Sequence, residues 1–350
     1  MTDYSYTVDS STELTTTTPV DITQQTTTGS SVTSSTQRGG TEFYFQCAVI
    51  VIGAVGMVAN ALILYAMVMS GEHKKHVLIF NQNALDFISC LSLIVTYSVK
   101  LCNIYLIGDH GYWLCMMILS EAMFWCPTCG SMVNIIVITI ARYLRVIHPT
   151  WSKPKQRRWI IYTAAAAAWI TGIVVSVGTT ATTATLIDGA CYTQVVYESE
   201  ASRITYAIFT LSIFVTILVI FFFCYGRILI VVRRQSSVIS GYIASGLNSS
   251  QVQSHELQSS VVKTMVLVCA LHAVTWTPVS VYLLLVILDS KFTSLDSSYY
   301  VLLFISLLYF CINPFIYATK FDPVNRALLG LIPCKTMSIQ PRPPAEIFNE

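Results

Sequence analysis

The sequence has few charged residues. Asp, Glu, Lys and Arg make up only 11% of its 350 residues, whereas soluble domains carry about 25%. A chain that exposed most of its surface to water would need more charge than this. The shortage excludes an ordinary water-soluble domain and indicates that much of the chain faces a different solvent.

Residues 1–42 contain no asparagine and almost no apolar side chains. Because the apolar segment of a signal peptide is missing, we expect no cleavable signal, and the first apolar run is expected to direct membrane insertion. A Ser/Thr-rich segment of this kind cannot offset the entropy lost on ordering, so a disordered extracellular tail is predicted. An O-glycosylated stalk and a bare flexible tail are equally favoured.

Apolar residues make up 54% of the chain, and they gather in seven runs that are each long enough to cross a bilayer as a helix of about 20 residues. The runs cover roughly residues 43–69, 77–100, 113–145, 159–184, 203–233, 260–288 and 297–319. The fold class predicted for residues 43–319 is an all-α membrane protein, a single bundle of seven transmembrane helices. Residues 320–350 are predicted to form a cytoplasmic segment. It begins with a short amphipathic helix, because Pro323 has the position of a first-turn proline.

Basic residues are unevenly distributed between the two sides of this predicted bundle. Of 20 Lys and Arg residues, only four share the side of the N-terminus: Arg38, Lys100, Arg203 and Lys291. Lys and Arg concentrate on the cytoplasmic side of membrane proteins, so the N-terminus is predicted outside and the C-terminus inside. The acidic excess left outside favours a cationic ligand.

Four short motifs occur in order on the second, third, sixth and seventh runs. They are Asp86, Ala141-Arg142-Tyr143, Trp276-Thr277-Pro278 and Asn313-Pro314-Phe315-Ile316-Tyr317. A charged arginine at the end of an apolar run is costly unless it has a use. Together the motifs resemble those of rhodopsin-type (class A) G protein-coupled receptors over approximately residues 43–331, without indicating a subfamily.

The resemblance implies that a ligand bound outside activates a heterotrimeric G protein inside. It assigns activation or G protein coupling to Arg142, Tyr143, Tyr225, Trp276, Pro278, Asn313, Pro314 and Tyr317. A proline within a helix removes a backbone hydrogen bond and bends the helix, and the family uses the bend at the position of Pro278 as a hinge.

Two residues depart from the family pattern. Ala141 replaces the acid that restrains the neighbouring arginine at rest in most relatives, and the loss of this restraint predicts raised basal signalling. His272 replaces a phenylalanine one turn before Trp276. We favour a structural hydrogen bond for this histidine over a pH sensor.

The resemblance also implies a sodium site formed by Asp86, Ser131 and Asn313, with Asn60 in the same cluster. Hard oxygen ligands suit a hard cation. The alternative is a protonated or hydrogen-bonded structural aspartate. Apart from this allosteric ion, no cofactor is expected.

The family further implies a disulfide between Cys115 and Cys191, both on the oxidising exterior. Cys115 is two residues further from Arg142 than is usual, so we expect a bulge near Pro127. Cys334, just beyond the amphipathic helix, is a candidate for palmitoylation, with a free thiol as the alternative.

The outer halves of the third, fifth, sixth and seventh runs are expected to line the ligand pocket. The candidate pocket residues are Glu121, Phe124, Trp125, Thr128 and Trp276. Phe124 has the position of the aspartate of amine receptors and Leu307 that of the retinal-binding lysine of opsins, so an amine is disfavoured and covalently bound retinal is excluded. Glu121 beside the tryptophans suits a cationic group, and a solvated glutamate is equally favoured.

The sequence therefore predicts a receptor and not an enzyme, located in the plasma membrane. Its expected partners are a heterotrimeric G protein, the lipid bilayer and an extracellular ligand, with a cationic peptide favoured and no nucleic acid. One alternative is a constitutively active or ligand-independent signalling protein. A polytopic transporter is less favoured, because no internal repeat is visible.

Overall fold

The computed structural model of the protein describes residues 31–102, 104–147, 154–193, 200–243, 249–288 and 297–330. Within these ranges, seven helices are long and apolar enough to cross a membrane. These spans are Gly40–Met69, Val77–Cys102, Gly108–Ile147, Trp159–Thr180, Ala207–Val231, Val262–Leu288 and Ser297–Lys320. The predicted all-α bundle of seven spans is confirmed.

The third span is interrupted, whereas each of the others is one continuous helix. The helical elements are α1 (Ser31–Met69), η1 (Glu72–Lys74), α2 (Val77–Cys102), α3 (Gly108–Leu114), η2 (Cys115–Leu119), α4 (Ala122–Ile147), α5 (Pro154–Thr183), α6 (Glu200–Ile243), α7 (Ser249–Leu288), α8 (Ser297–Lys320) and α9 (Asp322–Gly330). Helix α1 begins at Ser31, ahead of the predicted boundary at residue 43. The last part of the segment predicted to be disordered therefore has helical backbone.

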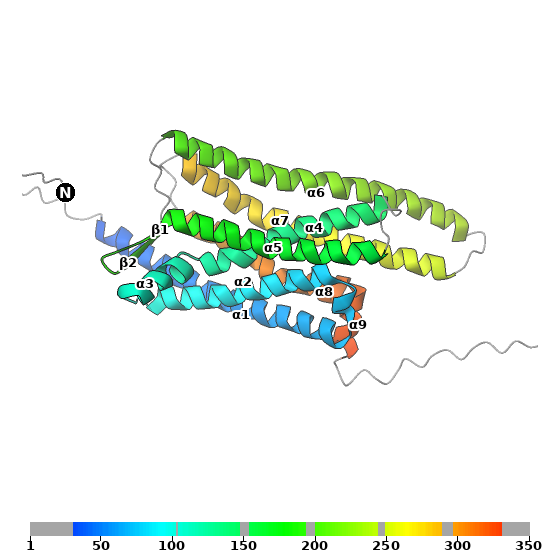
Figure 1. Ribbon diagram of the computed structural model, residues 1–350, viewed down its shortest axis with the longest axis horizontal. Coiled ribbons are helices and arrows are strands. Elements are labelled where there is room, and N and C mark those ends of the chain that lie inside the picture. The colour runs from blue at the N-terminus through cyan, green and yellow to red at the C-terminus, as the bar shows by residue number, and fades with distance from the viewer. Residues whose placement is uncertain are drawn as a thin grey trace, which may run out of the picture.

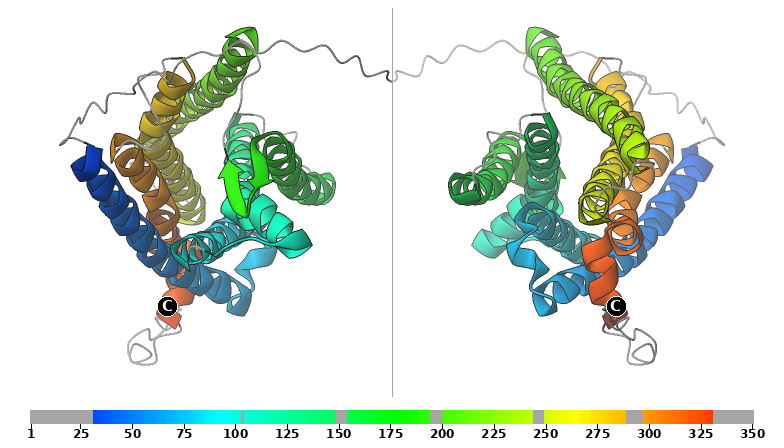
Figure 2. Two further views of the ribbon diagram at one scale, coloured as in Figure 1. Left: turned by 90° about the vertical axis from the view of Figure 1, so that its left-hand side faces the viewer. Right: turned by 90° about the vertical axis from the view of Figure 1, so that its right-hand side faces the viewer.

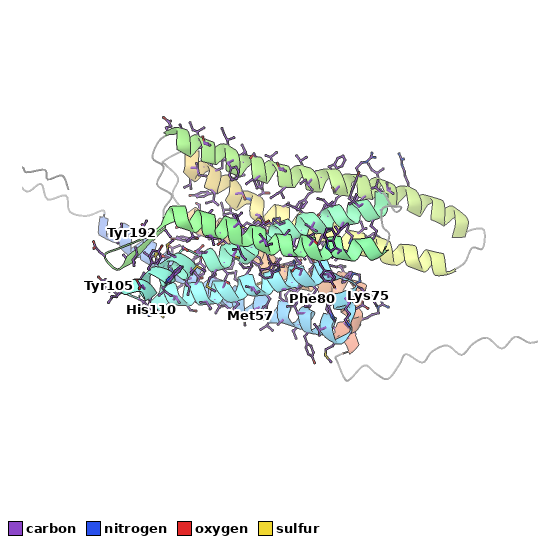
Figure 3. All side chains as sticks on the ribbon, in the orientation of Figure 1. Met57, Lys75, Phe80, Tyr105, His110 and Tyr192 are labelled. Atoms are coloured by element: carbon purple, nitrogen blue, oxygen red, sulfur yellow. A yellow bond between two sulfur atoms is a disulfide. The ribbon has the colours of Figure 1, made fainter. Side chains whose placement is uncertain are left out.

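The spans lie side by side along the long axis of the molecule (Figure 1) and form a ring when viewed end-on (Figure 2). Helix α1 packs against α2 and α8, α4 packs between α2 and α5, and α6 packs against α7. Tyr105 and Tyr192 lie at the end that carries α3, whereas Lys75 and Phe80 lie at the opposite end (Figure 3). We call these the outer and inner ends, following the predicted orientation.

The interruption of the third span accommodates the additional residues between Cys115 and Arg142. Cys115–Leu119 forms a π-helical turn, which takes in more residues per turn than an α-helix. Glu121 then adopts a left-handed conformation with φ 63°, which ends the helical path before α4 begins. The expected bulge near Pro127 is wrong, because Pro127 lies inside α4 and the extra length is absorbed before it.

The outer loop after α5 contains a β-hairpin that the sequence analysis treated only as a long loop. Strands β1 (Ala184–Ile187) and β2 (Ala190–Thr193) pair antiparallel. Asp188 and Gly189 form the two-residue turn with φ 49° and 77°, as tight hairpins require. The positive φ of Gly189 favours glycine at this position, and the exposed ring of Tyr105 packs on the space where a Cβ would lie.

The predicted amphipathic helix is present as α9, which follows Phe321 at the inner end of α8. Phe321 and Val324 are fully buried, while Arg326 and Leu329 on the other side are exposed. This burial holds α9 across the inner ends of α1, α7 and α8. The candidate palmitoylation site Cys334 lies outside the described residues.

Candidate functional site

Asp86 is the centre of a polar cluster buried in the middle of the bundle. Its Oδ1 accepts hydrogen bonds from Ser131 Oγ at 2.8 Å and Gln82 Nε2 at 3.0 Å, and its Oδ2 accepts one from Asn313 Nδ2 at 2.6 Å. All four residues are at most 3% exposed. A buried carboxylate needs such donors, because it has lost its water.

The structure brings three of the predicted sodium ligands together but not the fourth. Asp86, Ser131 and Asn313 are in contact, as expected. Asn60 instead donates its amide to the backbone oxygens of Gly56 and Phe310, at 2.9 and 3.0 Å. Asn60 therefore fixes α1 against α8, and sodium binding itself stays a prediction.

Aromatic rings fill the bundle above this polar cluster. Trp276 packs edge-on against Trp125 at 6.2 Å between ring centroids and against Phe310 at 6.3 Å. His272 stacks on Trp276 at 5.9 Å. The expected hydrogen bond is absent at its Nδ1, which is buried without a partner among the described residues. The ring of His272 thus serves as a packing surface, because its neighbours are aromatic.

Two of the candidate pocket residues lie too deep to face an open cavity. Phe124 is 2% exposed and packs against Trp125 and Phe310. The hydroxyl of Thr128 donates to the backbone oxygen of Phe124 at 2.7 Å and lies 3.3 Å from Ser89 Oγ. Phe124 and Thr128 therefore form the floor beneath the outer part of the bundle.

The inner end of α4 carries Arg142. Together with His76 and Arg145, Arg142 lines a small cavity of about 40 Å³. Burial, together with the charge of Arg142, lowers the pKa of His76 from 6.5 to about 4. Ala141 lines the same cavity. The position that holds an acid in most relatives is therefore close to Arg142 and Arg145.

The two tyrosines predicted to act in activation lie near the inner end but bond differently. Tyr225 Oη lies 3.1 Å from Thr139 Oγ1 and 3.3 Å from Cys269 Sγ. Tyr317 packs against Phe321, and its buried hydroxyl has no hydrogen-bond partner among the described residues.

The other residues assigned to activation or coupling lie on α4, α7 and α8. Tyr143 packs against Phe223 of α6. Pro278 and Pro314 lie inside α7 and α8, as predicted.

Glu121 at the outer end is already paired with a cation of the protein itself. Lys100 Nζ lies 2.5 Å from its Oε1, and Tyr97 Oη donates to the same oxygen at 3.0 Å. The side chains of Lys100 and Glu121 are 26% and 20% exposed. The solvated glutamate that the sequence left open is thereby excluded. A cationic ligand would have to compete with Lys100 for this carboxylate.

A cavity of about 520 Å³ opens at the outer end, between α1, α2 and the hairpin. Its lining includes Glu42, Gln46, Lys100, Tyr105 and Cys191. This volume falls in the usual range of ligand sites. None of the five candidate pocket residues lines this cavity. Lys100 connects the two regions, because it lines the cavity and pairs with Glu121.

The disulfide between Cys115 and Cys191 is present, with 5.4 Å between the Cα atoms. Cys191 pairs with Leu186 in the hairpin, and Leu106 N donates to Gly189 O at 3.1 Å. The bond ties β2 to η2, and the hairpin is thus held against the outer cavity.

Comparison with known proteins agrees with this geometry. A sequence profile described as 7 transmembrane receptor (rhodopsin family) matches residues 59–317. The chain belongs to the rhodopsin family of seven-transmembrane receptors. The crystal structure of squid rhodopsin is similar in fold, with a TM-score of 0.65 and 16% identity over 84% of this chain and 85% of that chain. No curated protein sequence matches.

Family membership identifies the protein as a class A G protein-coupled receptor and not an enzyme. Receptors of this family have an extracellular ligand and a G protein as partners, and they are multi-pass membrane proteins. The outer cavity and Arg142 lie at opposite ends of the bundle.

Two residues of the receptor's sites were missed from the sequence. Lys100 was counted only as an outer base, although an ionisable residue at the end of an apolar run indicates a functional partner. Gln82 lies one helical turn before Asp86, and this spacing places the two side chains on one face of a helix.

Proposed function

We propose that this receptor lies in the plasma membrane with its N-terminus outside, and that it couples an extracellular peptide to activation of a heterotrimeric G protein. The observation that carries the proposal is the placement of an open polar cavity at one end of the bundle and of Arg142 at the other. Helix α4 connects the two ends of the bundle, because it begins directly after Glu121 and carries Arg142 in its last turns.

A ligand bound in the outer cavity can influence the inner end of the bundle through side chains that already contact one another. Lys100 lines the cavity and contacts Glu121, and the indole of Trp125 interacts with the same carboxylate. Trp125 packs against Trp276, two residues before Pro278. Because a proline weakens the helix at its own position, displacement of Trp276 would swing the inner half of α7 outward and open the G protein site.

The cavity favours a peptide with a basic group over an anionic lipid or nucleotide. Glu42 and Gln46 line one side, and Gln46 Nε2 donates to Glu42 Oε1 at 3.1 Å. Among the described residues the hairpin beside the cavity has two strands, and an extended chain could pair with its outer backbone edge. A carboxylate and a strand edge are both features that a basic peptide recognises.

The test is a cell-based screen of peptides, amines and lipids with G protein activation as the readout. A peptide that activates the parent should fail on Arg142→Ala at equal surface expression. Glu42→Gln should raise the half-maximal concentration of a basic peptide without changing the maximal response. Activation by an amine or lipid alone would contradict the peptide assignment, and activation that survives Arg142→Ala would contradict the coupling mechanism.

Ligand-independent signalling is the second candidate, and Ala141 favours it. Alanine at position 141 cannot form the ion pair that relatives use between this position and the arginine at rest. A high G protein activity in cells that express the parent without any added ligand, and that disappears in Arg142→Ala, would support this candidate.

A further inference from the structure

The side-chain amide of Gln82 lies where a cation bound by Asp86 would have to lie. Gln82 Nε2 is 3.0 Å from Asp86 Oδ1 and donates a second, short hydrogen bond to Ser131 Oγ. These two oxygens are the facing pair of the predicted sodium site, 2.8 Å apart. The amide nitrogen carries two N–H donors, so it satisfies both oxygens and excludes a cation from between them. The donor set, as arranged, does not fit sodium.

The orientation of this amide is determined by a chain of hydrogen bonds. Trp169 Nε1 of α5 donates to Asn81 Oδ1 at 2.9 Å. Asn81 Nδ2 donates to Asn134 Oδ1 at 3.0 Å, and Asn134 Nδ2 donates to Gln82 Oε1 at 2.9 Å. An indole can only donate, so each amide in the chain has one orientation. Gln82 must therefore present its N–H groups, and not its oxygen, to Asp86.

We propose that Gln82 replaces the allosteric cation in this receptor, so that Asp86 Oδ1 and Ser131 Oγ are satisfied without sodium. Asn313 Oδ1, on the other side of the carboxylate, is buried without a hydrogen-bond partner among the described residues. With Ser131 and Asn313, the amide supplies three donors to one carboxylate. The prediction of a sodium site rested on the presence of oxygen ligands, which the chain has. It did not include the donor one turn earlier on α2, Gln82, whose amide bridges the hydrogen-bonded pair of Asp86 and Ser131.

Sodium titration of the purified receptor tests this proposal and requires neither a ligand nor a G protein. The melting midpoint is measured in sodium chloride and in N-methylglucamine chloride at equal ionic strength. The parent should show no difference. In Gln82→Ala, which lacks the donor, the melting midpoint should rise with sodium concentration, and the rise should be saturable and specific to sodium. At ten times the dissociation constant, bound sodium increases the ratio of folded to unfolded protein about elevenfold.

Matched variants separate this effect from a general loss of stability. Asn83→Ala removes the adjacent buried amide, which donates to Ile79 O at 2.8 Å and not to Asp86, so it should remain insensitive to sodium. The double variant Gln82→Ala, Asp86→Asn should lose the gained response. If Gln82→Ala does not fold, Gln82→Ser gives the same test with a smaller cavity.

Two results would overturn the proposal. One is a saturable sodium-specific stabilisation of the parent that Asp86→Asn abolishes, since sodium would then bind despite Gln82. The other is a folded Gln82 variant that remains insensitive to sodium, since the amide would then not be what excludes the ion. Neither result depends on which ligand or G protein the receptor uses, so the proposed function would be unaffected.

Discussion

Lys100 Nζ and Glu121 Oε1 lie 2.5 Å apart, and this ion pair joins the outer end of α2 to the point where the third span is interrupted. Glu121 has a left-handed backbone, a conformation that costs free energy for a residue with a Cβ. The pair therefore stabilises a strained position, and its Lys100 also lines the outer cavity.

Breaking the pair on one side should destabilise the receptor more than removing both charges. Lys100→Met and Glu121→Gln should each lower the free energy of unfolding by about 1–3 kcal/mol, because a partly buried charge loses its partner. The double variant should cost less than the sum. Lys75→Met is the control, since it removes an exposed pair with Glu72 of the kind worth about 0–1 kcal/mol. Additive melting shifts would contradict this coupling.

Loss of the disulfide should reduce the amount of receptor at the cell surface. Cys115→Ser and Cys191→Ser each release β2 from η2, and a bond that closes a long loop stabilises a fold by about 2–4 kcal/mol. Surface labelling by flow cytometry measures the effect. Cys102→Ser, at an exposed free cysteine, should express like the parent. Normal expression of both bridge variants would show that the hairpin holds its position unaided.

Restoring the missing acid should lower basal signalling. In Ala141→Asp the carboxylate gains a partly buried, charge-assisted hydrogen bond to Arg142, worth about 1–3 kcal/mol. This bond favours the resting state, so basal output should fall by roughly tenfold, the ratio that corresponds to about 1.4 kcal/mol. The measurement is second-messenger output at matched surface receptor number, with Ala141→Asn as the uncharged control. An equal or higher output would mean that another partner already restrains Arg142.

Acidification should destabilise the receptor through His76. Its pKa is lowered from 6.5 to about 4 by burial and by the charge of Arg142, so the folded state binds this proton less readily than the unfolded state. The neutral ring contributes fully above pH 6.5, and stability falls as the pH drops from 6.5 towards 4, by up to about 2 kcal/mol at pH 5. The carboxylate of Glu72, with its Oε2 3.6 Å from His76 Nε2, raises the pKa of His76 and so opposes part of the lowering.

Melting midpoints between pH 7.5 and 5 test the role of His76. His76→Phe keeps the edge-on packing against Phe321, 4.9 Å between centroids, and removes the titrating group, so its stability should vary less with pH. His110→Gln, at an exposed outer position, should keep the parent's pH dependence. An identical pH profile for His76→Phe and the parent would assign the effect to other groups.

Most of the fold could be predicted from the sequence because the signals are local. A bilayer requires about 20 apolar residues in each helix, so Val77–Cys102 and Ser297–Lys320 are visible as runs in the chain. The start of α9 could likewise be predicted from Pro323. The turn of the β-hairpin was readable in principle, since Asp188-Gly189 is a typical hairpin pair. It was missed because the flanking strands are only four residues long.

The sequence by itself determined the seven spans, the receptor family and two of the partners of Asp86, Ser131 and Asn313, because hydrophobic length and motif spacing depend on neighbours along the chain. Only the tertiary structure decided what these residues contact. Gln82 and Asn134 are 52 residues apart, and Lys100 and Glu121 are 21 apart. A buried amide or carboxylate takes whichever partner the packing of separate helices brings within about 3 Å, and no local pattern in the chain specifies that distance.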